Sequence, residues 1–271
     1  APFLFRVIAE YVRACAPDVI VNLGDQVTGR ADPERAYRLQ SELDAVEVLG
    51  SAEPRLNDDD PLSRWLRDQL PRAAVERLTR LPAAARVADG DVFACHGAPD
   101  DPNGHLFRSW RGGPYLASPA DELRAALEPL QARVVLCGHT HREAATALGD
   151  TLVVNVGAVS LQVDGDPRAR WALLEERNGR WLVDFRRVPY DRARALAAYE
   201  RTGMLEKGGL SAAIFREELR HARSFIVPFL MWCEEEKLER SQEIWSEYRR
   251  MRASRFALPE ELTTVRASEE P

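Results

Sequence analysis

The sequence predicts an α/β fold followed by a helical tail. Segments with apolar residues at helical spacing alternate with short apolar runs that end at glycine, over residues 3–15, 18–25, 32–43 and 45–50. Further along, pairs of strand-like segments flank Gly149-Asp150 and Asn178-Gly179, which are typical of tight hairpin turns. This alternation of helices and strands, followed by hairpins, indicates a layered α/β core.

The intervening segments have local signals of their own. Asp32-Pro33 is a cap and first-turn pair that opens the helix over 32–43. Apolar spacing predicts one helix over 62–81, and another over 119–130. Asp89-Gly90 between strand-like runs predicts a third hairpin, whose second strand ends at His96.

We expect a core at residues 1–190 and a helical C-terminal extension at residues 191–271. The extension is charged, and Pro228 is expected to break or kink it. Trp232, Trp245 and Tyr248 fall on one face, which could support a homo-oligomer or dock a partner. The alternative is that these helices pack back on the core.

The composition is that of an ordinary globular protein. The 271 residues are 45% hydrophobic and 30% charged, with a net charge of −6. The acidic balance disfavours nucleic acid as a partner. The four cysteines are widely spaced, which indicates a reducing compartment, and we expect a cytoplasmic protein. No apolar run predicts a membrane span, and no signal peptide is recognisable.

The strongest functional signal follows a short buried strand at residues 134–136. Gly138 ends this strand, and His139 and His141 come directly after it. In an extended or tightly turned backbone, residues two apart project to the same side, so both imidazoles can share one site. Imidazole is a common metal ligand, although two hydrogen-bonded loop histidines are the simpler alternative.

Two other strand ends carry candidate ligands, Asp25 after Leu23-Gly24 and His96 after Cys95. Taken singly, Asp25 is more typical of a turn and His96 of an ordinary strand-end histidine. Because ligands gather at the carboxyl ends of strands in α/β sheets, these residues can converge with His139 and His141. Such a set suits Zn, Mn, Fe or similar ions, and two metals about 3.5–4 Å apart activate water for phosphate-ester hydrolysis.

These motifs resemble those of the calcineurin-like metallophosphoesterases, and specifically their compact bacterial phosphodiesterase-like branch. The matching segments share order and spacing with the family: Gly24-Asp25-Gln26-Val27-Thr28-Gly29 with GDxxxxG, His96-Gly97-Ala98-Pro99 with HGxP, Gly138-His139-Thr140-His141 with GHTH, and Asn155-Val156-Gly157-Ala158-Val159 with NPGSV.

The resemblance implies a four-layered α/β/β/α sandwich with two divalent metal ions, of the kinds Mn, Fe, Zn or Ni, at one sheet edge. It implies that Asp25 bridges both metals, that His96 and His139 bind the second metal, and that His141 binds the first. The implied function is metal-dependent hydrolysis of a small phosphate ester, a phosphodiester or a phosphomonoester.

The sequence departs from the family in two places. The family opens with a strand ending in DxH, whereas this sequence starts inside the helix expected to follow that strand. The family also has GNH, whose Asn is a ligand and whose His is the general acid, where this chain has Gly50-Ser51-Ala52-Glu53. No general acid can be assigned.

Two explanations remain open. Either the sequence lacks residues at both places, or the protein is a catalytically degenerate scaffold or sensor with the same fold. The retained histidines, and the cost of a sheet without an inner strand, favour the first explanation. His105, nine residues after His96, is expected at the surface, with contact to substrate as the alternative.

Overall fold

The computed structural model describes residues 2–110 and 115–256. Its centre is a five-stranded mixed sheet whose strands, in spatial order, are β3 (Ala84–Val87), β4 (Val92–Cys95), β7 (Val134–Cys137), β9 (Thr151–Val156) and β8 (Glu143–Leu148). The three inner strands are parallel, and the two edge strands are antiparallel to their neighbours. The parallel inner strands therefore all end at the same edge of the sheet.

A long hairpin forms the second β layer. Strands β10 (Ala169–Arg177) and β11 (Arg180–Val188) pair around Asn178-Gly179, as the sequence predicts. One face of the hairpin carries Leu174, Val183 and Phe185, which pack against the central sheet. The other carries Ala169 and Trp171, which pack against helix α1 (Pro2–Ala14). Because side chains alternate along a strand, the hairpin separates two apolar layers.

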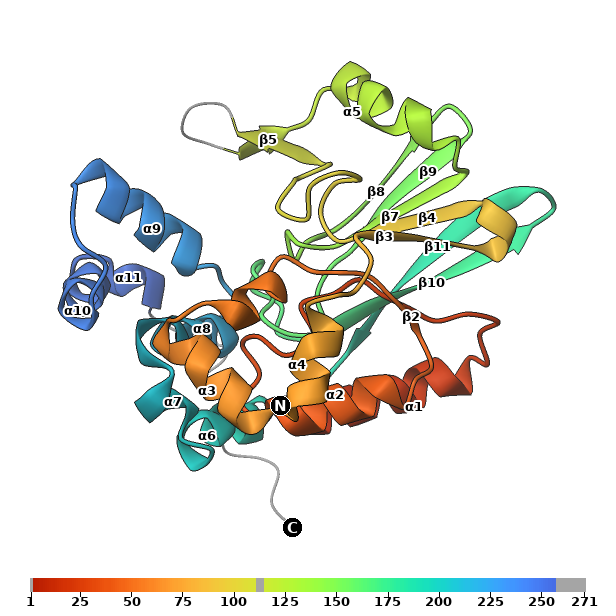
Figure 1. Ribbon diagram of the computed structural model, residues 1–271. Helices are drawn as coiled ribbons and strands as arrows, with labels where there is room; N and C mark the ends of the chain where they lie inside the picture. The colour runs from red at the N-terminus through yellow and green to blue at the C-terminus, as the bar shows by residue number, and fades with distance from the viewer. Residues whose placement is uncertain (1, 111–114, 257–271) are drawn as a thin grey trace, which may run out of the picture.

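Helix α5 (Ala120–Leu127) covers the opposite face of the central sheet with Leu123 and Leu127. In Figure 1 α5 lies at the top and α1 at the bottom, with both β layers between them. The order helix, sheet, hairpin, helix confirms the predicted four-layered sandwich.

Two short parallel strands, β1 (Val21–Asn22) and β2 (Val46–Glu47), form a separate pair joined through α2 (Pro33–Ser41). Both strands are shorter than predicted from the apolar runs. The α2 helix begins as expected, because the Asp32 side chain accepts from the N–H of Arg35 and Pro33 occupies the first turn.

The predicted helix over 62–81 is in fact two helices, α3 (Pro61–Gln69) and α4 (Arg72–Leu78). Leu70 is extended, with φ −105° and ψ 142°, because the proline that follows disfavours a helical backbone at the residue before it. A hairpin of β5 (Arg108–Trp110) and β6 (Tyr115–Ala117) had no sequence signal. The 3₁₀ turns are η1 (Pro54–Asn57), η2 (Ala88–Gly90) and η3 (Glu128–Leu130).

The described part of the C-terminal extension consists of helices joined by short non-helical segments, and residues 257–271 lie outside that part. Its helices are α6 (Arg192–Arg201), α7 (Met204–Lys207), α8 (Gly209–His221), α9 (Ile226–Glu235), α10 (Gln242–Met251) and α11 (Ala253–Phe256). Ala198, Tyr199 and Ala212 share one hydrophobic cluster with Trp65 and Leu66 of α3. The first helices of the extension therefore pack on the core.

Pro228 does not break the extension, contrary to expectation. It is the third residue of α9, where a proline removes no intrahelical hydrogen bond. The break lies upstream, where Ala222 adopts a left-handed backbone with φ 50°. Trp245 and Tyr248 are buried against Phe229 in a second cluster, so these two aromatic side chains pack within the chain.

Across the described residues, no helix combines the length and apolar character needed to cross a lipid bilayer.

A buried carboxylate joins α8 to α9. Glu218 accepts hydrogen bonds from the backbone N–H groups of Phe225 (2.7 Å) and Ile226 (2.9 Å). Burial raises the pKa of Glu218 from 4.5 to about 6, because desolvation disfavours the carboxylate more than these bonds favour it. Between these two pH values the folded state holds a proton that the unfolded state has lost.

This contribution to stability is complete below about pH 4.5 and is lost as the pH rises through about 6. The free energy of unfolding of the wild type should therefore fall by about 2 kcal/mol relative to Glu218→Gln between pH 4.5 and pH 7. Urea unfolding at several pH values measures this difference. The exposed Glu239→Gln is the control, and equal pH profiles of Glu218→Gln and wild type would contradict the assignment.

Candidate metal centre

Three strand ends meet at one edge of the sheets. Asp25 follows β1, His96 follows β4, and the pair His139 and His141 follows β7. His96 Nδ1 lies 2.5 Å from the carbonyl oxygen of Leu23, and the Gly138 N–H donates to the His96 carbonyl at 2.7 Å. The structure thus brings the candidate ligands together, as the sequence predicts.

The donor atoms of this cluster lie within contact distance of one another. His96 Nε2 is 3.4 Å from Asp25 Oδ2 and 3.3 Å from His139 Nδ1. Because a carbonyl can only accept, Nδ1 of His96 carries the proton in its bond to Leu23, which leaves Nε2 as the nitrogen available to a metal. Burial lowers the pKa of His96, but the hydrogen bond and charge of Asp25 outweigh burial and raise that pKa, so a metal at Nε2 competes with a proton. The coordinating nitrogen of His96 therefore faces the other two donors.

His141 is held in the same way, with Nδ1 2.7 Å from the carbonyl oxygen of Leu161. This bond also leaves Nε2 as the lone-pair nitrogen. A backbone carbonyl that binds the second ring nitrogen is typical of metal-binding histidines.

The backbone of the histidine pair differs from the extended form considered at the level of sequence. His139 and His141 have positive φ values, 62° and 57°. Such a backbone is strained for a non-glycine residue and is concentrated at functional sites. Asn155 supports this loop, since its Nδ2 donates to the Gly138 carbonyl at 2.5 Å and to Thr140 Oγ1 at 3.1 Å.

Glu53 fixes the opposite side of the site. Its carboxylate, only 1% exposed, accepts from the backbone N–H groups of Asp25 (3.0 Å), Gln26 (2.7 Å) and Gly50 (2.8 Å). A Cβ on Gly50 would lie 2.3 Å from the backbone nitrogen of Asp25, so only glycine permits this approach. The turn at residues 50–53 and the Asp25 loop are thereby locked together.

Ser51 and Ala52 lie inside this closed turn, directly against the Asp25 carboxylate. The Ala52 N–H donates to Asp25 Oδ1 at 2.8 Å, and Ser51 Oγ lies 3.3 Å from Oδ2. Glu53 closes the turn that begins at Gly50. Ser51 and Ala52 therefore lie against the carboxylate of Asp25, the bridging ligand implied by the resemblance.

The ionisable groups of the site change one another's pKa values. Burial raises the pKa of Asp25, but the hydrogen bond and charge of His96 outweigh burial and hold that pKa well below its usual range. Burial and the neighbouring His96 lower the pKa of His139 to about 4. Burial also lowers the pKa of His141. At neutral pH, His139 and His141 are therefore uncharged, as a metal ligand must be.

Among the described residues, no group of three or more His, Cys, Asp or Glu side chains is arranged to hold a metal ion as it stands. The pairwise separations nevertheless suit one. Ligands about 2.1 Å from an ion at tetrahedral angles lie about 3.4 Å apart, which matches the two distances to His96 Nε2. The donor chemistry and the second-nitrogen hydrogen bonds therefore fit a divalent metal.

His105 lies beside the site, so the expectation that it lies at the surface is wrong. Its ring centroid is 5.0 Å from that of His139 in an edge-to-face arrangement, and the residue is half-buried rather than at the surface. The loop between β4 and β5 returns it to the strand ends. No spacing rule identifies such a residue, because the loop between it and His96 has no regular structure.

Comparison with known families identifies the chain. The family model of the calcineurin-like phosphoesterase superfamily domain matches residues 3–179. The chain belongs to this superfamily. The match ends at Gly179, in the turn before β11, so the C-terminal helices lie beyond it. Members of this family usually use divalent metals, in agreement with the donor set of the site. The compact bacterial branch stays a prediction.

Solved structures agree on the fold. A metallophosphoesterase from Sphaerobacter thermophilus is 23% identical, with a TM-score of 0.63, covering 81% of this chain and 95% of its own. A hypothetical protein from Pyrococcus horikoshii is 15% identical, with a TM-score of 0.62, covering 83% of this chain and 95% of its own. No curated protein matches the sequence.

Replacement of Glu53 by Gln should open the locked turn. A glutamine side chain has one acceptor oxygen, so at least one of the three backbone N–H groups loses its partner in a buried place. The expected loss of unfolding free energy is about 1–3 kcal/mol. Binding of Mn²⁺ should weaken as well, because Asp25 is no longer held.

Urea unfolding and titration calorimetry with Mn²⁺ measure the two effects. The exposed Glu236→Gln is the control for loss of a charge. Unchanged stability of Glu53→Gln would contradict the role assigned to this carboxylate.

Proposed function

We propose that the protein is a metal-dependent phosphoesterase that hydrolyses phosphodiesters or phosphomonoesters. The observation that carries the proposal is the convergence of Asp25, His96 and His139 through 3.3 and 3.4 Å separations, with His96 Nδ1 bound to a backbone carbonyl. Imidazole nitrogens beside an ionised carboxylate form a donor set for Mn, Fe, Zn or Ni.

In this proposal Asp25, His96, His139 and His141 would hold two divalent ions, with Asp25 between them. Bound ions of this kind polarise the phosphoryl group and lower the pKa of a water that attacks it. Glu53 and Asn155 act on the ligands rather than on the substrate, because they fix the two loops that carry Asp25 and the histidine pair.

Buried Arg30 supports the same loop. Its guanidinium donates to Ser160 Oγ at 2.5 Å and lies 3.4 Å from the Asp25 carbonyl oxygen. It places a positive charge behind the acidic ligand, where it offsets negative charge gathered in the site.

Ala52 determines which esters can react. By resemblance it stands where the family has the histidine that protonates the leaving group, and a methyl group donates no proton. The leaving oxygen therefore departs as an anion, which is easy for a phenolate and difficult for an alkoxide. We propose an activity that is selective for good leaving groups.

The first test is hydrolysis of bis-p-nitrophenyl phosphate and p-nitrophenyl phosphate after chelation, with Mn²⁺ added back. We expect metal-dependent turnover that falls at least about 100-fold in His139→Ala, since one lost ligand removes the transition-state stabilisation of an ion. The surface variant Arg80→Ala should keep full activity. The two substrate rates separate diesterase from monoesterase activity.

The second test restores a proton donor. Ala52→His should increase kcat for an alkyl phosphodiester by about 10²-fold or more, which is the usual contribution of a positioned acid. It should change the rate for bis-p-nitrophenyl phosphate much less. Equal effects on both esters would contradict the role given to position 52.

A degenerate scaffold or sensor is the second candidate function. It is favoured by one specific observation, that Ser51 and Ala52 replace a ligand and the general acid within an intact turn. It predicts binding of Mn²⁺ without turnover of either p-nitrophenyl ester. Docking or homo-oligomerisation through the C-terminal helices belongs to this candidate.

A further inference from the structure

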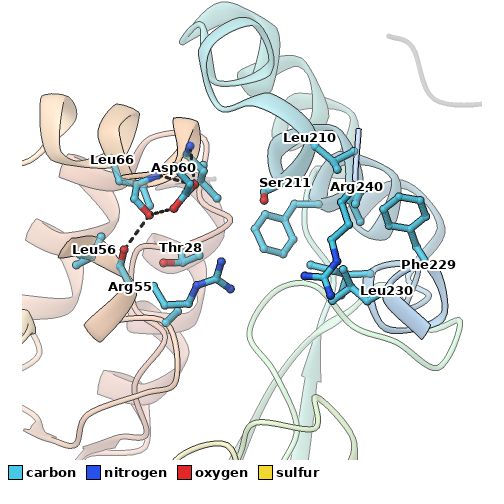
Figure 2. Close-up of a pocket in the computed structure, with 16 residues that line it drawn as sticks. Thr28, Arg55, Leu56, Asp60, Leu66, Leu210, Ser211, Phe229, Leu230 and Arg240 are labelled. Atoms are coloured by element: carbon cyan, nitrogen blue, oxygen red, sulfur yellow. Dashed lines mark hydrogen bonds between the residues drawn. The ribbon is translucent and has the colours of Figure 1, made fainter. Parts of the chain in front are cut away.

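A pocket lies between the phosphoesterase core and the C-terminal helices, with a volume of about 180 Å³. From the core it is lined by Thr28 of the Asp25 loop, by Ala52, and by Arg55 of η1. From the extension it is lined by residues of α8, α9 and the segment between α9 and α10. Figure 2 shows these two walls facing each other.

This pocket adjoins the candidate metal centre. Ala52 lines the pocket and also donates its N–H to the Asp25 carboxylate at 2.8 Å. Thr28 belongs to the same loop as Asp25, three residues further along. The described lining holds none of the candidate metal ligands, and the pocket is connected to the metal centre through Ala52 and the Asp25 loop.

Two guanidinium groups give the pocket positive charge. In Figure 2 the side chains of Arg55 and Arg240 point into the same space from opposite walls. Among the described residues, the ion pair of Arg55 is with Asp58 at 3.6 Å, and both side chains are more than half exposed, so this pair costs little to break. Within the described chain, Arg240 forms no ion pair. Asp60, the acidic residue of the lining, is engaged as the cap of α3.

The remainder of the lining is apolar with a few hydroxyl groups. Phe215 and Leu230 are half-buried side chains of the extension wall, and Thr28 and Ser211 place hydroxyls beside them. An aromatic ring packs well on such a surface. The hydroxyls of Thr28 and Ser211 can form hydrogen bonds with the nitrogen and oxygen atoms of a heterocyclic ring. A hydrocarbon chain would leave these hydroxyls without a hydrogen-bond partner.

We propose that this pocket binds an aromatic heterocyclic phosphate ester, of the nucleoside monophosphate type, with its phosphate between Arg55 and Arg240. Arginine is suited to phosphate through paired hydrogen bonds. The helices beyond residue 179 thus supply half of a substrate site for the core. The binding of this ligand does not depend on the proposed function, but its role as a substrate rests on that function.

The test measures binding without metal, so that it is independent of turnover. Titration calorimetry or ligand-observed NMR, in the presence of chelator, compares AMP, adenosine and ribose phosphate on the full chain. We expect AMP to bind more tightly than either fragment. Arg240→Ala and Arg55→Ala should each weaken AMP about tenfold and leave adenosine unchanged.

Two further variants sharpen the result. Ser211→Phe fills the pocket from α8 and should weaken both AMP and adenosine. Arg250→Ala removes an exposed arginine of α10 outside the pocket and should change neither. The proposal is overturned if AMP does not bind, if ribose phosphate binds as tightly as AMP, or if Arg240→Ala behaves like Arg250→Ala.

The same variants separate this proposal from the proposed function. If AMP binds in a way that depends on Arg240 but no ester is hydrolysed, the proposed ligand of the pocket is supported and the proposed phosphoesterase activity is contradicted. The opposite result is metal-dependent hydrolysis of p-nitrophenyl esters that is unchanged in Ser211→Phe and Arg240→Ala, together with no binding of AMP. It would support the phosphoesterase activity and contradict the proposed ligand of the pocket.

Discussion

The site depends on one buried carboxylate. Glu53 accepts hydrogen bonds from the N–H groups of Asp25, Gln26 and Gly50, and so joins two loops that follow different strands. Its pKa is raised by burial and by the charge of Asp25, and these hydrogen bonds act against that rise. Without this carboxylate three buried donors would lose their acceptor, and Asp25 would not be held beside His96.

The other side of the site depends on the central sheet. Parallel β4 and β7 end at one edge, so His96 and the histidine pair are delivered there by rigid elements. Asn155, at the end of β9, then orders the loop after β7 through its side chain. The positive φ values at His139 and His141 are thus stabilised by hydrogen bonds from elsewhere in the fold, and not by residues that favour this backbone conformation.

Much of this arrangement could be predicted from the sequence. The strand runs and the Asp89-Gly90, Gly149-Asp150 and Asn178-Gly179 turns predicted the sheet and hairpins, because their signals are local. The break at Leu70-Pro71 was missed because the apolar spacing continues across it. The place of His105 was missed because it depends on how an irregular loop returns, which only tertiary packing determines.

The outcome at residues 50–53 shows what sequence and structure contribute separately. The sequence revealed that Ser51 and Ala52 depart from the family pattern, but it left missing residues as one explanation. The structure shows a turn that Glu53 closes and whose Ala52 N–H binds Asp25. Ser51 and Ala52, where the family has Asn and His, therefore lie against the carboxylate of Asp25.

We propose that Asp25, His96 and His139 surround a divalent ion. The most direct measurement is an anomalous difference map from crystals grown with Mn²⁺, collected on either side of the manganese absorption edge. We expect a peak within about 2.0–2.3 Å of Asp25 Oδ2 and His96 Nε2. A map with ordered side chains and no peak among these residues would contradict it.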